Sequence, residues 1–284
     1  MSTDELISRL TGWLGRLMPA GPRRDRLTDD LRATFGGRDD PLTEEVCRNV
    51  VACAQKHSRH LELFFTAEAT ASPDSEPVGW GPPDAAAIRA RGGGISAVRR
   101  LDDGTVVLTV DGLETYGIAQ PYVDAAFTLA QGASRLVLDL RDNGGGDPAT
   151  VAAIAGRLLG DGAQHLSDVV YADRRRQWWT PDLPSGTALA VDTTVLVSSR
   201  TYSSAEALAY HLQARKRVTV VGEATRGAAD HVTPIQLTPQ VFGLLPQATV
   251  VDTVTGTNWE GTGVRPDEPC PADDALRLVT AKRP

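Results

Sequence analysis

Short apolar runs alternate with helical patterns through the centre of this 284-residue chain. Residues 136–140 form a strand-length apolar run, which leads through a glycine cluster into a helical pattern at about 148–159. Residues 194–198 form a second such run, followed by a helical pattern at about 204–214 and another strand at 217–221. Parallel strands need long crossover connections, so this alternation predicts βαβ units and a mostly parallel sheet covered by helices.

The first part of the chain has a different pattern. Apolar residues recur there at helical spacing in three sets: Leu6, Leu10, Trp13, Leu14 and Leu17; Leu27, Leu31 and Phe35; and Val46, Val50, Cys53 and Ala54. Asp40 followed by Pro41 predicts the start of the third helix. We therefore expect a helical N-terminal domain at residues 1–70. A Pro- and Gly-rich linker or loop at 71–91 and an α/β core at 92–284 would follow.

The charge balance bears on the kind of partner. The chain has 36 acidic and 29 basic residues and a net charge of −7, which argues against nucleic acid or an anionic membrane as the main partner. No apolar run approaches the roughly 18 residues of a membrane span. The first residues lack a secretory signal pattern, and the three cysteines contain no CxxC pair. We expect a cytoplasmic location with reduced thiols and no membrane span.

Residues 139–147, DLRDNGGGD, follow directly on the first buried run. Parallel sheets bind ligands at this end of their strands, and consecutive glycines leave backbone N–H groups uncovered. Gly145 and Gly146 are therefore candidates for an oxyanion hole. Two alternatives remain open: a tight turn without function, and a loose dinucleotide motif formed by Gly144, Gly146 and Ala149.

Ser203 stands at a second strand-to-helix junction. A serine hydroxyl held on such a turn at a helix N-terminus is placed to act as a nucleophile, because the site favours negative charge. The alternative is purely structural, since Ser203 and Glu206 also match the capping-box pattern.

Two further segments contain ionisable candidates. Glu260 lies between Trp259 and glycine-rich backbone and could be a shielded carboxylate. His57 and His60 lie three residues apart near the expected end of a helix, and histidine is the usual general base near neutral pH. No third ligand of matching type stands near this pair, so we expect neither a metal nor another cofactor.

Four motifs in order resemble the tail-specific, or C-terminal processing, serine peptidases. They are DLRDNGGGD, RTYSSAE at 200–206, VGEATRG at 221–227 and TGTNWEGTGVRPD at 255–267. The resemblance extends over about residues 92–278 and is greatest to the branch of the tricorn protease core and interphotoreceptor retinoid-binding protein. It implies a ClpP/crotonase-like α/β core without a PDZ domain, preceded by a small all-α bundle.

The resemblance also implies roles for particular residues. Ser203 matches the nucleophile, and Ser204 with Gly145 or Gly146 matches the oxyanion hole. The loop at Gly227-Ala228 lacks the lysine of the classical members.

In place of the lysine, the tricorn-like branch implies His60 and Glu260 as the groups that assist the serine. Asp230 stands where many relatives have a histidine, with His231 beside it, so these two residues are candidates for the substrate pocket, and His231 is the alternative base.

We therefore predict a serine-type hydrolase acting on a peptide or a small acyl or apolar substrate. One alternative is a biosynthetic cyclase or acyl transferase that uses the same oxyanion hole. Another is a non-catalytic carrier of a retinoid or fatty acid. The sequence leaves homo-oligomer formation open.

Overall fold

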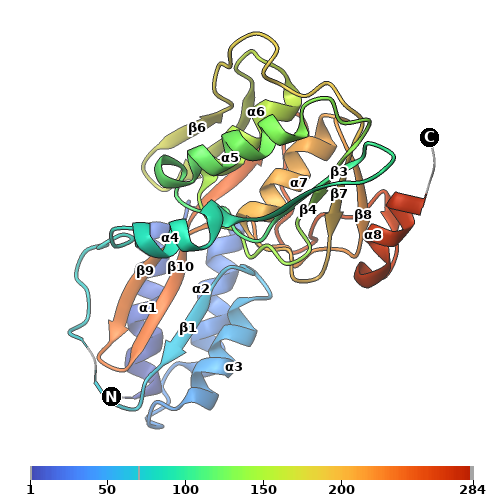
Figure 1. Ribbon diagram of the computed structural model, residues 1–284. Helices are drawn as coiled ribbons and strands as arrows, with labels where there is room; N and C mark the ends of the chain where they lie inside the picture. The colour runs from blue at the N-terminus through green and yellow to red at the C-terminus, as the bar shows by residue number, and fades with distance from the viewer. Residues whose placement is uncertain (1, 70, 282–284) are drawn as a thin grey trace. The chain divides into compact units, whose positions relative to one another are not determined.

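The computed structural model describes residues 2–69 and 71–281, and these divide into two compact units (Figure 1). The predicted domain limits at Met1, Thr70 and Pro284 lie outside the described residues. Unit 1 contains Met1–Pro82, Val169–Arg176 and Ala228–Val250. Unit 2 contains Pro83–Asp168, Gln177–Gly227 and Val251–Pro284. The chain passes from one unit to the other after Pro82, after Gly227 and within three strands: β5 (His165–Tyr171), β6 (Arg175–Trp179) and β10 (Val241–Asp252).

Unit 2 is built on a six-stranded sheet with the order β11-β8-β7-β4-β3-β2. Its strands are β2 (Ile95–Arg100), β3 (Val106–Val110), β4 (Leu136–Asp139), β7 (Thr193–Val197), β8 (Thr219–Gly222) and β11 (Glu268–Pro269). All neighbouring pairs are parallel except β2 with β3. The predicted mixed α/β core is confirmed.

The helices of unit 2 follow the strands as the alternation predicts. They are α4 (Ala85–Ala90), the 3₁₀ turn η1 (Gly92–Gly94), α5 (Tyr116–Ala130), α6 (Pro148–Leu159), α7 (Ser204–Ala214) and α8 (Ala272–Ala281). β4 is buried along its whole length, as expected for a central parallel strand. Apolar residues of four strands pack with Ala275 and Val279 of α8.

Unit 1 contains three helices and an antiparallel hairpin. The helices are α1 (Thr3–Leu17), α2 (Pro22–Phe35) and α3 (Glu44–Ala54); β1 (Glu62–Phe65) pairs with β10, which also pairs with β9 (His231–Thr238). The helices share one apolar core with the hairpin, to which Ile235, Leu237, Val241 and Leu245 contribute. The N-terminal helices thus pack against strands that come much later in the chain. The domain limits predicted from sequence stay a prediction.

Two details of the N-terminal segment differ from the sequence interpretation. The third helix begins at Glu44, not near Pro41, because the Thr43 hydroxyl accepts the Val46 N–H at 3.1 Å. The carbonyl of Asp40 is already bonded to the Thr3 N–H at 2.9 Å. Residues 62–65 form a strand where helix was expected, because their backbone pairs with β10.

No helix in the described ranges combines the length and the apolar character that crossing a membrane requires.

Candidate active site

The glycine turn, residues 140–147 between β4 and α6, is held by a buried asparagine. Asn143 Nδ2 donates to the Val110 carbonyl at 2.9 Å, and its Oδ1 accepts the Gly145 N–H at 2.8 Å. The Leu113 N–H donates to the Gly145 carbonyl at 2.9 Å. The side chain of Asp147 caps α6, accepting the Ala149 N–H at 2.9 Å. A carboxylate at that helix N-terminus disfavours a pyrophosphate there, so the dinucleotide alternative has no support from this geometry.

The serine turn, residues 198–203 between β7 and α7, has a strained backbone at its last residue. Ser203 has φ 55° and ψ −121°, a combination that side-chain-bearing residues avoid, and it directly precedes α7. Ser203 and Glu206 form the reciprocal capping pair, in which the Glu206 carboxylate accepts the Ser203 N–H at 2.8 Å. Strain on a strand-to-helix turn is how hydrolase folds expose a nucleophilic hydroxyl. The capping pattern and a catalytic position therefore coexist here.

The glycine turn and the serine turn lie against each other. The Tyr202 N–H donates to the Asn143 carbonyl at 3.1 Å, and Ser204 Oγ donates to the Gly146 carbonyl at 2.7 Å. A side chain at Gly145 would place its Cβ 2.9 Å from Ser203 Cβ, which leaves room only for glycine. The structure therefore brings together the two motifs that the sequence separates by about sixty residues.

The N–H groups around Ser203 differ in availability. The Gly145 N–H is bonded to Asn143. Those of Gly146 and Ser204 donate no hydrogen bond within residues 2–69 and 71–281. Because the Gly145 carbonyl faces Leu113 and the peptide is trans, the Gly146 N–H points away from Leu113.

Glu206 connects the serine turn to the loop after β8. This fully buried carboxylate accepts hydrogen bonds from Thr225 Oγ1 and from the Gly227 N–H, both at 2.6 Å. The Gly227 carbonyl in turn accepts the Gly261 N–H at 2.8 Å, next to Glu260. A chain of hydrogen bonds therefore runs from the predicted nucleophile to the loop that carries Glu260.

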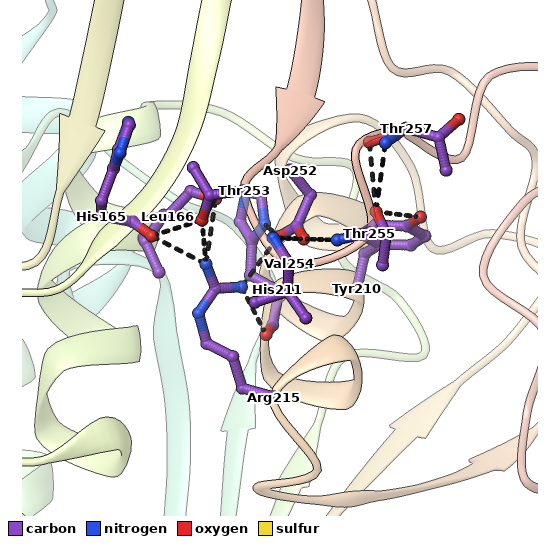
Figure 2. Close-up of polar contacts among 10 residues, drawn as sticks. All are labelled: His165, Leu166, Tyr210, His211, Arg215, Asp252, Thr253, Val254, Thr255 and Thr257. Atoms are coloured by element: carbon purple, nitrogen blue, oxygen red, sulfur yellow. Dashed lines mark hydrogen bonds and ion pairs between the residues drawn. The ribbon is translucent and has the colours of Figure 1, made fainter.

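The residue before Glu260 is also fixed. Trp259 is buried and meets the edge of His211 at 5.9 Å between ring centroids. His211 Nδ1 lies 2.7 Å from Asp252 Oδ2, and Arg215 Nη1 lies 2.8 Å from the same oxygen (Figure 2). The pKa of Asp252 is lowered: burial raises it, but the contacts with His211 and Arg215 outweigh burial. This ionic cluster stabilises the end of β10 against α7.

The other predicted site residues belong to unit 1 and form a second group. His60 is buried, and its Nδ1 lies 2.5 Å from the Asp230 carbonyl. A carbonyl only accepts, so the neutral ring carries its proton on Nδ1 and is basic at Nε2. Burial lowers the pKa of His60, against the opposing effect of Asp230.

Asp230 organises this group. Its buried carboxylate receives a bidentate pair from Arg23, at 2.7 and 3.0 Å, and the Ser58 hydroxyl at 2.7 Å. His231 begins β9, and burial, with the charges of His60 and Arg176, lowers its pKa to about 4. His57, in contrast, pairs at 2.7 Å with the exposed Asp30. Of the two N-terminal histidines, His60 is therefore the buried one.

Two of these residues carry no sequence signal of their own. Asp252 and His211 become noticeable only through their pairing, which joins parts of the chain 41 residues apart. The description of residues 2–69 and 71–281 contains no group of three or more His, Cys, Asp or Glu side chains arranged to hold a metal ion.

Residues 93–270 match the peptidase family S41. A candidate peptidase from Parabacteroides merdae has a similar structure, with a TM-score of 0.69 at 15% identity over 99% of this chain and 96% of that one. A lipoprotein from Streptococcus agalactiae gives 0.58 at 15% identity over the same shares. The photosystem II D1 C-terminal processing protease gives 0.49 at 24% identity over 63% of this chain and only 47% of its own length.

The family match covers more than half of the chain, so this protein belongs to peptidase family S41. The predicted resemblance to tail-specific proteases is confirmed.

Proposed function

We propose that Ser203 is the nucleophile of a peptide hydrolase. The observation that carries this proposal is the strained backbone of Ser203, set against the glycine turn at the N-terminus of α7. Ser203 Oγ attacks the substrate carbonyl carbon and forms an acyl-enzyme as the amine leaves, and water then releases the acid. Three functional groups, an oxyanion site, a base and an orienting carboxylate, complete the proposed mechanism.

Gly146 and Ser204 supply the oxyanion hole in this proposal. Their N–H groups have no other acceptor in the described parts of the chain, whereas the Gly145 N–H is used by Asn143. Gly145 then donates no hydrogen bond to the oxyanion. Its role is to let the glycine turn approach the serine turn closely, because it has no side chain. Such preorganised donors stabilise the tetrahedral oxyanion by about 3 kcal/mol each.

His60 is the proposed general base. Its Nε2 takes the proton of Ser203 Oγ and later gives it to the leaving amine, while Glu260 orients the histidine or a water molecule. The Nδ1 contact with the Asp230 carbonyl and the lowered pKa support this role, because both favour a neutral ring that is basic at Nε2. His231 remains the alternative base. Asp230, whose carboxylate is held by Arg23 and whose carbonyl contacts His60, is the proposed pocket residue beside the base.

Further expectations belong to the same proposal. The parallel strands with α5, α6 and α7 in their crossovers support a ClpP/crotonase-like core. The helices α1–α3 support a mostly helical N-terminal bundle, which also includes the strand β1. We propose a peptide substrate on the basis of family membership, and a cytoplasmic location on the basis of the sequence.

Labelling by a fluorophosphonate tests the nucleophile. We expect one phosphonylated peptide, which contains Ser203, and none in S203A; S204A is the matched control and should still be labelled. Hydrolysis of a peptide library by the wild type then separates a peptidase from a transferase. Binding of a retinoid or fatty acid without labelling or turnover would indicate a carrier and contradict the proposal.

A further inference from the structure

Arg226 lies on the loop after β8, between two residues that are fixed to Glu206. Thr225 Oγ1 and the Gly227 N–H both bond the buried Glu206 carboxylate at 2.6 Å. The Arg226 side chain itself is exposed. A rigid backbone on both sides therefore presents a solvent-accessible guanidinium.

The guanidinium is directed toward the serine turn. Arg226 Cζ lies 4.8 Å from the centroid of the Tyr202 ring, and Tyr202 directly precedes Ser203. Stacking on an aromatic ring orients an arginine while leaving its N–H edge available for hydrogen bonding. Arg226 thus contacts the residue that precedes the proposed nucleophile.

The charge of Arg226 is not compensated by its neighbours. No carboxylate of residues 2–69 or 71–281 forms an ion pair with it, whereas Arg200 on the serine turn pairs with Asp142 at 2.6 Å. Glu206 is bonded to Ser203, Thr225 and Gly227. Glu223, three residues before Arg226, accepts the Ala272 N–H at 3.2 Å.

We propose that Arg226 binds a carboxylate of the substrate and thereby determines specificity. The inference rests on Ser203 being the reaction centre. A planar guanidinium that is oriented by an aromatic ring, and has no ion-pair partner among the described residues, can bind a carboxylate through two parallel hydrogen bonds. The carboxylate is either an acidic side chain near the scissile bond or the free C-terminus of the peptide. The substrates are therefore peptides with negative charge at the cleavage site.

Matched peptides test this specificity. One pair differs only in Glu or Gln near the cleavage site, with an amidated C-terminus; a second pair has neutral side chains and differs in a free or amidated C-terminus. We expect kcat/KM to be about 10- to 100-fold higher for the charged member of one pair. In R226Q this ratio should fall to about one. R226K should retain part of the preference, and R200Q all of it.

Two outcomes separate this inference from the function on which it rests. Equal ratios in wild type and R226Q, with normal labelling of Ser203, would overturn the role of Arg226 and leave the nucleophile standing. If no peptide is cleaved, protection of Ser203 from the fluorophosphonate replaces turnover as the measurement. The charged peptides should then protect the wild type more than R226Q, and equal protection would contradict the inference.

Discussion

At the scale of single residues, Ser203 combines a helix cap with a strained backbone. The φ angle of 55° is one of only two positive values at non-glycine residues in the described ranges; the other is at Lys216. Such a conformation costs about 1–3 kcal/mol and persists only where the surroundings impose it. Here the surroundings are the Glu206 carboxylate and the backbone at Gly145.

This strain predicts opposite effects of two substitutions on stability. S203A should lose activity and up to about 1 kcal/mol of unfolding free energy, because Ala keeps the Cβ and loses the cap. S203G should lose activity too, but should be more stable than S203A by about 1 kcal/mol, because glycine accepts this φ at little cost. Urea denaturation of both variants measures the difference.

The test of strain is which of S203A and S203G has the larger free energy of unfolding. If S203G is less stable than S203A by denaturation, with equal m values, Ser203 is not strained in solution. S204A and S204G at the next position, which is ordinary helix, are the matched controls, and there glycine should be the less stable variant.

Sequence predicted that the glycine and serine motifs come together, but not which hydrogen bonds each group makes. The motif order indicated Ser203, Gly145 and Gly146, and the structure shows the two turns in contact. That Asn143 takes the Gly145 N–H could not be foreseen, because it depends on a hydrogen bond from Asn143 to Val110, 33 residues earlier.

At the scale of elements, the N-terminus of α7 is fixed through Glu206. One oxygen of its carboxylate accepts the Ser203 N–H and the other accepts Thr225 Oγ1 and the Gly227 N–H. A single side chain thus connects the serine turn to the loop that presents Arg226.

E206Q should disturb both connections. The glutamine amide nitrogen cannot accept, so at least one buried donor loses its partner, at a cost of about 1–3 kcal/mol. We expect lower thermal stability and a large loss of kcat, although Ser203 is unchanged. Calorimetry and peptide turnover measure the two effects, with E45Q on the exposed face of α3 as the control. Wild-type stability and turnover in E206Q would contradict this account of the serine turn.

Sequence predicted the elements of unit 2 better than those of unit 1. The α6 and α7 ranges agree because each begins at a capping residue, Asp147 or Ser203, and carries an apolar face. β1 was missed because four residues carry little periodicity, and its strand conformation comes from pairing with β10.

At the scale of the whole molecule, the chain order does not follow the division into units. α1–α3 share an apolar core with β9 and β10, some two hundred residues later. Local propensity carries no information about such a pairing, so sequence alone predicts the N-terminal helices as a separate domain.

The central claim is that His60 activates Ser203. The most direct measurement is the rate of fluorophosphonate labelling of Ser203 as a function of pH, in wild type, H60Q and H231Q. Burial lowers the pKa of His60, and the neutral ring is the active base, so the wild-type rate should rise with pH through a midpoint below 6.5 to a plateau. H60Q should lose this step and about 10²–10⁴ in rate, and H231Q should keep both. Wild-type rates and the same step in H60Q, with both lost in H231Q, would contradict the account.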